Sequence, residues 1–211
     1  MFIVPLLFTL CQITSFAYGF NEQEVSLNNF PVQYKQYAYK KCRENDLSYE
    51  MFLAVAFNES RFTIDAMNIN KNGTIDRGLC QINDSCFSFL NSKGVLNSKE
   101  ELFNPYINID CYIELMKYHK EFTGNENLAL LRYQVGAGGY KKIINSRKAN
   151  ETHQKVLKYR DDFRNYMKSN PLEILDLYNR DTYIYLRTDY PEYLSVLKAR
   201  FISFEWQGRY R

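Results

Sequence analysis

The chain has few of the residues that interrupt regular structure, and almost no excess of charge of either sign. Of its 211 residues, 9 are glycine and 5 are proline, which argues against a collagen-like, low-complexity or linker-rich protein. The net charge of +3 is too small to indicate a nucleic-acid partner. With 45% hydrophobic and 24% charged residues and no internal repeat, the composition is typical of one folded domain, with or without an appendage.

The chain also lacks clusters of metal ligands. It contains no C-x-x-C pair, and its only two histidines, His119 and His153, lie far apart in the sequence. Zinc sites usually draw cysteine and histidine ligands from short, regular spacings. We therefore expect no metal site and no cofactor.

Long apolar runs are missing everywhere except at the N-terminus. Residues 1–19 contain no charged side chain, Phe2–Leu10 is an apolar core, and Ala17-Tyr18-Gly19 fits a small-x-small cleavage site. This pattern predicts a signal peptide, residues 1–19, and hence export to the periplasm. We separately expect the protein to be a monomer. Lipid attachment at Cys11 is disfavoured because a bulky leucine precedes the cysteine.

Export changes how the cysteines are interpreted. After removal of Cys11, four remain, an even number in an oxidising compartment, which predicts at least one disulfide. They are Cys42, Cys80, Cys86 and Cys111. The sequence does not choose among their three pairings.

One apolar stretch, Leu53–Phe62, contains an acid near its end. Phe52, Val55 and Ala56 precede Glu59 by seven, four and three positions, so at 3.6 residues per turn they share one helix face with it. The negative end of the helix dipole and the apolar neighbours should both raise the pKa of Glu59. Such a carboxyl can act as a general acid. The alternative is a glutamate at a frayed helix end that faces water.

The rest of the chain is predicted to be mostly α. Ser48 is an N-cap for a helix over residues 49–60, and Asn72-Gly73 in the polar segment 61–78 predicts a β-hairpin. A calcium loop there is disfavoured because Leu79 stands where a bidentate glutamate is needed. Further helices are predicted over residues 32–42, 105–122, 128–134, 140–147 and 151–168, from Pro171, and from Pro191, while 182–187 fits a strand or a helical turn.

Four segments in order carry a resemblance to a known family. They are Asn58-Glu59-Ser60-Arg61-Phe62, Gly78-Leu79-Cys80-Gln81-Ile82-Asn83, Asn104-Pro105-Tyr106-Ile107-Asn108-Ile109 and Ala129–Gly138. Together they resemble the soluble lytic transglycosylases, in particular the small enzymes that accompany bacterial secretion systems. The resemblance covers roughly residues 32–145. It implies a lysozyme-like helical domain with a small β-hairpin over residues 20–149, followed by a helical C-terminal extension over 150–211.

The resemblance also implies a reaction and a set of site residues. The reaction cleaves the MurNAc-β-1,4-GlcNAc bond of peptidoglycan and leaves a 1,6-anhydro end, with Glu59 as the single general acid and base. The implied substrate-binding residues are Ser60, Gly78, Leu79, Gln81, Ile82, Tyr133 and Gln134. Ser60 would orient the Glu59 carboxyl, and Tyr133 would lie over the reacting bond. The chain departs from the family pattern at Cys80, where methionine is usual, and at Gln134-Val135, where asparagine and alanine are usual.

Two other functions stay open at this point. A hydrolysing lysozyme would pair Glu59 with a second carboxylate, and Asp76 at the exit of the hairpin is the candidate. A catalytically silent peptidoglycan-binding protein of a secretion or flagellar assembly is the other alternative.

Overall fold

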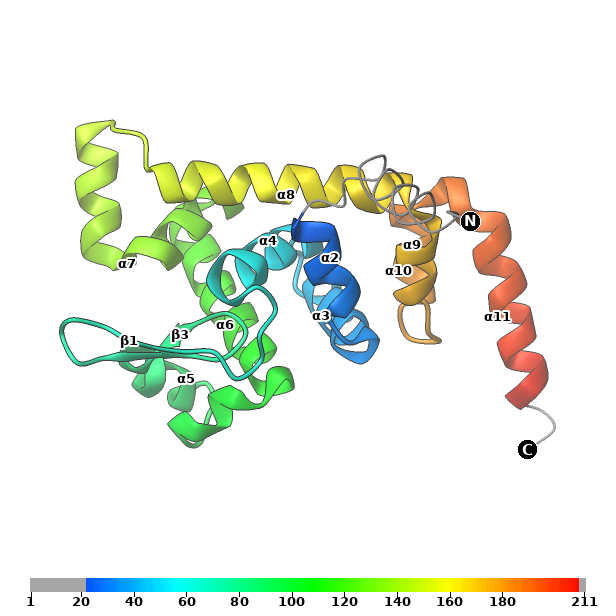
Figure 1. Ribbon diagram of the computed structural model, residues 1–211, viewed down its shortest axis with the longest axis horizontal. Helices are drawn as coiled ribbons and strands as arrows, with labels where there is room; N and C mark the ends of the chain where they lie inside the picture. The colour runs from blue at the N-terminus through cyan, green and yellow to red at the C-terminus, as the bar shows by residue number, and fades with distance from the viewer. Residues whose placement is uncertain (1–21, 209–211) are drawn as a thin grey trace, which may run out of the picture.

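The computed structural model describes residues 22–208 and shows a helical body with a small β-sheet on one side (Figure 1). The predicted signal peptide, residues 1–19, and Cys11 within it lie outside the described residues. The α-helices are α2 (Glu22–Asn29), α3 (Val32–Glu44), α4 (Tyr49–Ser60), α5 (Phe87–Ser92), α6 (Pro105–Thr123), α7 (Glu126–Ser146), α8 (Glu151–Ser169), α9 (Pro171–Asp176), α10 (Tyr183–Asp189) and α11 (Leu194–Gly208). Short 3-10 turns are η1 (Asp84–Cys86), η2 (Lys99–Phe103) and η3 (Pro191–Tyr193). The predicted mostly-α fold is confirmed.

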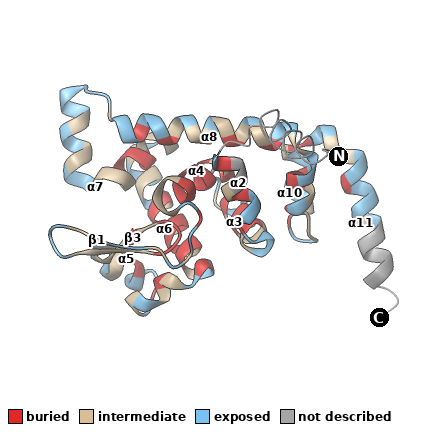
Figure 2. Cartoon of the chain, in the orientation of Figure 1, coloured by how far each residue is buried: buried red, intermediate tan, exposed pale blue. Residues whose placement is uncertain are grey.

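Helix α4 is the centre of the core, and its predicted bounds are confirmed. The Ser48 side chain caps its first turn by accepting a hydrogen bond from the Met51 amide. Every residue from Tyr49 to Phe57 except Glu50 is buried, as the red colour of this helix shows in Figure 2. The helix ends at Ser60, and its C-cap, Arg61, has a left-handed φ of 53°. A helix buried on all sides and ending at the protein surface places its last turn at the edge of the core.

The predicted hairpin is present, with a third strand that the sequence did not reveal. Strands β1 (Met67–Ile69), β2 (Ile75–Arg77) and β3 (Ile82–Asn83) form an antiparallel sheet in that order. The turn between the first two contains Gly73, with φ of 80°, as the Asn-Gly signal requires. The third strand is only two residues long, too short for any alternation of polar and apolar residues to be visible.

Helix α7 covers the two helices predicted over residues 128–134 and 140–147, and it is broken between them at Gly136. Gly136 is not helical, with φ of 68° and ψ of 174°, and the helix changes direction there. The ambiguous segment 182–187 is helical from Tyr183 onward, where it belongs to α10, and Thr182 is the N-cap of that helix. The break in α7 leaves its second half at an angle to the body (Figure 1).

The residues after 150 pack on the body through α8, α9 and α10. The α8 rings of Tyr159 and Phe163 lie edge-on to Phe57 of α4, with centroids 5.0 and 5.9 Å away. Lys35 of α3 and Glu173 of α9 form a 3.1 Å ion pair, and both side chains are buried. Breaking one partner of a buried pair leaves an uncompensated charge, which is costly. These contacts hold α8–α10 against α3 and α4.

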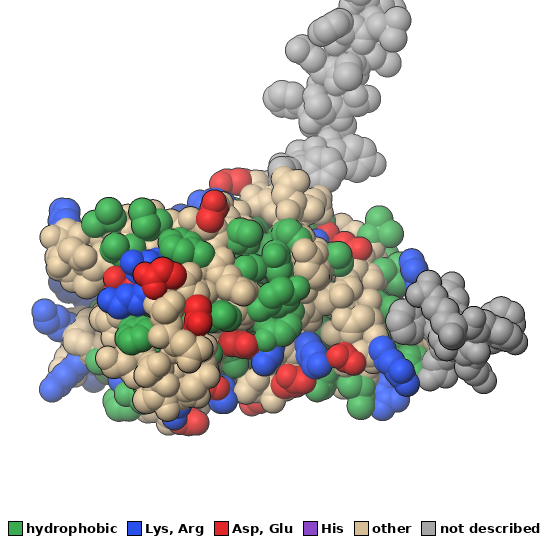
Figure 3. Space-filling model, turned by 90° about the horizontal axis from the view of Figure 1, so that it is seen from below, with side chains coloured by type: hydrophobic (Ala, Val, Ile, Leu, Met, Phe, Trp, Pro, Cys, Tyr) green, Lys and Arg blue, Asp and Glu red, His purple; other side chains and the backbone are tan. Residues whose placement is uncertain are grey.

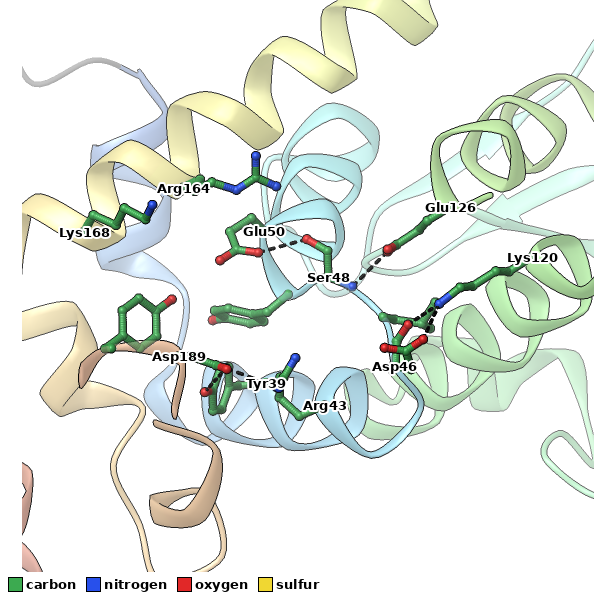
Figure 4. A pocket seen from close by; sticks show the side chains of 13 residues that line it. Tyr39, Arg43, Asp46, Ser48, Glu50, Lys120, Glu126, Arg164, Lys168 and Asp189 are labelled. Atoms are coloured by element: carbon green, nitrogen blue, oxygen red, sulfur yellow. Dashed lines mark hydrogen bonds and ion pairs between the residues drawn. The ribbon is translucent and has the colours of Figure 1, made fainter. Parts of the chain in front are cut away.

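A polar cavity of about 430 Å³ lies at this junction (Figure 4). Four basic and four acidic side chains line it: Arg43, Lys120, Arg164, Lys168, Asp46, Glu50, Glu126 and Asp189. Several are already satisfied within the fold, since Asp189 binds Tyr39 and Arg43 while Lys120 binds Asp46. The cavity therefore lies at a charged interface between the C-terminal helices and the rest of the fold, and we call it the seam cavity.

The predicted disulfide is wrong. The structure has Cys42, Cys80, Cys86 and Cys111 as free thiols, three of them buried and Cys86 partly buried. Burial raises the pKa of the Cys42 and Cys80 thiols well above the ordinary value. A buried thiol packs as a small apolar side chain, and these four do so in the core or at its edge.

The surface carries charges of both signs. On the face drawn in Figure 3, acidic and basic side chains are interspersed with hydrophobic ones. Between residues 22 and 208, no helix combines the length and the apolarity needed to cross a bilayer.

Candidate active site

A cleft of about 1100 Å³ lies between the end of α4, the β-sheet, α5, α6 and the break in α7. Five of the predicted site residues line it: Glu59, Gln81, Ile82, Tyr133 and Gln134. Asp76, the candidate second acid, lines it as well. The residues that line it but were not predicted are Asn70, Lys71, Asn72, Thr74, Asn83, Ser85, Cys86, Phe89, Leu115, Tyr118, His119, Arg132, Val135, Gly136 and Ala137.

Glu59 reaches the cleft from the last turn of α4 and is partly buried. Its Oε1 accepts a 3.1 Å hydrogen bond from the side-chain amide of Asn58. The pKa of Glu59 is raised, chiefly because burial disfavours the charged form, and the nearby Asp76 charge adds to this while the Asn58 bond opposes it. A carboxyl with a raised pKa keeps its proton at a higher pH than an ordinary glutamate does. It is the group in this cleft best suited to general acid catalysis.

Asp76 forms part of the sheet wall and is held by asparagine side chains. Its Oδ2 accepts hydrogen bonds from Asn70 at 2.9 Å and from Asn68 at 3.4 Å. Its Oδ1 accepts one from Asn83 on β3 at 2.5 Å. Three amide donors therefore fix this carboxylate in place across the hairpin.

The α7 wall is formed by Tyr133 and Gln134. The Tyr133 hydroxyl donates a 2.8 Å hydrogen bond to the Cys80 carbonyl, which fixes the ring against the turn after β2. The Gln134 Oε1 lies 3.2 Å from the His153 Nδ1 on α8. The side chain of Gln134, which is longer than the asparagine usual in the family, is thus held by a residue of α8.

Three predicted residues do not line the cleft and instead support its wall. The Ser60 hydroxyl lies 2.7 Å from the Leu79 carbonyl and 3.1 Å from the Ala56 carbonyl, so it joins α4 to the turn after β2. Leu79 is fully buried. Gly78 has φ of 74°, and a Cβ at this position would lie 2.2 Å from the Leu102 carbonyl oxygen. Only glycine fits so close an approach of two backbones.

Gln81, in the turn after β2, and Ile82, the first residue of β3, line the cleft side by side in the sequence. The Gln81 Nε2 donates to the carbonyls of Ala66 and Gly78, both at 3.0 Å, so this amide nitrogen is used to hold the turn. Ile82 is nearly fully buried. The predicted hydrogen bond between Gln81 and a sugar therefore depends on the side-chain oxygen, Oε1.

Asn108 of α6 is a supporting residue to which the sequence analysis gave no role. It is fully buried, and its Nδ2 donates to the carbonyls of Arg77 at 3.0 Å and Leu102 at 2.8 Å. Its Oδ1 accepts from the Cys80 amide at 2.9 Å. The sequence feature that could have indicated this supporting role is the position of Asn108 in the segment Asn104–Ile109, which resembles the family pattern.

No group of three or more histidine, cysteine, aspartate or glutamate side chains in residues 22–208 is placed to hold a metal ion. The arrangement offers one acid of raised pKa, one fixed carboxylate, and amide and aromatic side chains along a long cleft. Clefts lined in this way suit a polar polymer such as a glycan strand.

Comparison with protein families gives one finding. The family model for the transglycosylase SLT domain matches residues 36–156. The match spans more than half of the chain and includes every residue that lines the cleft. A search of curated proteins gave no match.

Proposed function

The chain belongs to the transglycosylase SLT family, whose members act on peptidoglycan, and we propose that it is a lytic transglycosylase with Glu59 as its general acid and base. The product would be a glycan strand ending in 1,6-anhydro-N-acetylmuramic acid. The observation that supports this most is the position of Glu59: a carboxyl of raised pKa at the end of a buried helix, open to a long cleft.

The reaction needs two proton transfers at one carboxyl. Glu59 donates its proton to the glycosidic oxygen as the C1–O bond breaks, and the leaving N-acetylglucosamine keeps that proton on its 4-hydroxyl. The Glu59 carboxylate then takes the proton of the muramoyl C6 hydroxyl while that oxygen bonds to C1. No water is consumed, and Glu59 ends in the protonated form in which it began.

A hydrolysing lysozyme is the second candidate, because Asp76 lines the same cleft. In ordinary glycosidases a second carboxylate acts as nucleophile or activates water. Asp76 is engaged by three asparagine amides, which suits a fixed structural charge better than an attacking group. In the transglycosylase reaction the C6 hydroxyl replaces the second carboxylate.

The products and the Asp76→Asn variant together test the proposal. We expect purified peptidoglycan to yield muropeptides that weigh one water less than hydrolysis products, as mass spectrometry reads directly. Asp76→Asn should keep most of this activity at acid pH. Because the Asp76 charge raises the Glu59 pKa and the reaction needs protonated Glu59, the alkaline limb of the rate should move to lower pH.

Other outcomes would identify the alternatives. Reducing muramic acid ends, together with an inactive Asp76→Asn variant, would show a lysozyme. Binding of peptidoglycan without any release of fragments would show a silent binding protein.

We also propose that the protein is exported to the periplasm as a monomer, where a secretion or flagellar assembly could use it. The support is the uncharged segment 1–19 with its small-x-small site. N-terminal sequencing of the exported protein should find a start just after Gly19. A lipid-modified Cys11 at the mature N-terminus would contradict this.

A further inference from the structure

A buried cation, Arg132, lines the cleft and precedes the predicted site residue Tyr133 in the sequence. Arg132 lines the cleft, yet its side chain is so enclosed that the residue is only 7% exposed. Its guanidinium lies over the rings of Phe122 and Tyr118, 4.3 and 4.9 Å from their centroids. Cation–π contacts of this kind hold the group in place but do not neutralise it.

Arg132 forms no ion pair with any residue in the described range 22–208. The other strongly buried cation of the fold, Lys35, is paired with Glu173 at 3.1 Å. The two carboxyls of the cleft, Glu59 and Asp76, are hydrogen-bonded to asparagine amides instead. A buried charge without a counter-ion is costly, so a cleft that keeps one is suited to an anionic ligand.

His119 adds a polar group beside Arg132 without adding charge. Its Nδ1 lies 2.5 Å from the Arg132 Nη1, and because guanidinium can only donate, the Nδ1 accepts and the ring proton is on Nε2. Burial, followed by the Arg132 charge, lowers the pKa of His119 to about 4. The ring is therefore neutral near pH 7, and its Nε2 remains a hydrogen-bond donor.

Aromatic rings of the cleft lie next to Arg132 and His119. Phe89 of α5 and Tyr118 of α6 both line the cleft, with ring centroids 4.9 Å apart. The His119 ring lies 6.4 Å from the Tyr133 ring. Aromatic faces can stack on a sugar ring while the adjacent donors reach its substituent. The arrangement fits a sugar that carries an acidic group.

We propose that Arg132 and His119 form a carboxylate-binding subsite for the muramoyl unit of the glycan. The proposal rests on the proposed function in that the polymer is peptidoglycan. Two sources would supply the same chemistry: the lactyl carboxylate of a peptide-free strand, or a carboxylate of the attached peptide. The fixed, bidentate geometry of guanidinium suits either one.

The test measures binding rather than cleavage, in the full chain carrying Glu59→Gln. Three soluble glycan oligomers are compared: peptide-free with free lactyl carboxylates, the same oligomer with its carboxyls converted to neutral amides, and peptide-bearing. One of the two anionic forms should bind roughly ten- to a hundredfold more tightly than the neutral amide. The form that binds more tightly identifies the source of the carboxylate. Adding Arg132→Met should remove this preference, and Arg132→Lys should retain part of it.

Arg164→Met is the matched control, because it removes the same charge at the seam cavity, and it should leave the three affinities unchanged. Circular dichroism shows whether Arg132→Met folds. If it does not, two other results test the proposal: the three affinities of the Glu59→Gln chain, and a smaller preference for the anionic oligomer when His119→Gln is added to that chain. Equal affinity for all three oligomers, or an equal loss for all three in Arg132→Met, overturns the proposal. A chain that releases no anhydro product but keeps the Arg132-dependent preference would refute only the proposed enzymatic function.

Discussion

Glu59→Gln is expected to lower the rate of peptidoglycan cleavage by about a hundred- to ten-thousandfold, the usual cost of losing general acid–base catalysis. The loss should lie at the upper end because one group performs both proton transfers. Glutamine has the same shape and can still donate a hydrogen bond, but it cannot deliver and retrieve a proton. Release of anhydromuropeptides over time, measured by mass spectrometry, gives the rate.

The fold should survive this substitution. Glu59 is partly buried with a raised pKa, so replacing it with a neutral isostere removes a desolvation cost rather than a stabilising charge. The melting temperature should therefore stay the same or rise slightly. Glu121→Gln, an exposed position on α6, is the matched control and should cleave at the native rate. Native-like cleavage by Glu59→Gln would remove this residue from the mechanism.

The position of Glu59 could be predicted from the sequence because all of its determinants are local. Ser48 begins the helix, the apolar face fixes the direction of Glu59, and the end of the apolar pattern places it in the last turn. Each of these signals acts within a few residues along the chain. The predicted increase in its pKa is confirmed for the same reason.

The rest of the cleft depends on contacts between distant segments, which periodicity does not reveal. Asp76 and Asn83 are brought together by the third strand, and that strand is too short to leave a pattern. Ser60 meets Leu79 rather than the carboxyl beside it, because the turn after β2 packs on the end of α4. The position of Arg132 in the cleft could not be predicted either, because its partner, His119, lies on the preceding helix.

The disulfide prediction failed because it depended on compartment and count rather than on geometry. Export makes a disulfide permissible, but pairing also requires two sulfur atoms whose backbones approach closely. Cys42 and Cys111 belong to α3 and α6, and both face the core as free thiols. The sequence shows a cysteine on an apolar face, and such a residue serves as well for packing as for a disulfide.

Asn108→Ala should be the most damaging substitution outside the cleft. It leaves the Arg77 and Leu102 carbonyls and the Cys80 amide without the hydrogen bonds they now make. A buried polar group left unpaired costs about 1–3 kcal/mol, so we expect a loss of roughly 3–5 kcal/mol in the free energy of unfolding. For a chain of this length that corresponds to a fall of about 10 °C in melting temperature.

The same substitution should lower activity even at temperatures where the protein is folded. The turn that Asn108 holds also carries the Cys80 carbonyl that binds Tyr133 and the Leu79 carbonyl that binds Ser60. Loosening it moves the α7 wall and the end of α4 relative to each other, and small misplacements of reacting groups are costly. Asn145→Ala, at an exposed position of α7, should change stability by less than about 0.5 kcal/mol. Thermal unfolding and cleavage rates of both variants decide the matter: if Asn108→Ala matches Asn145→Ala in both, the three hydrogen bonds do not hold this wall of the cleft.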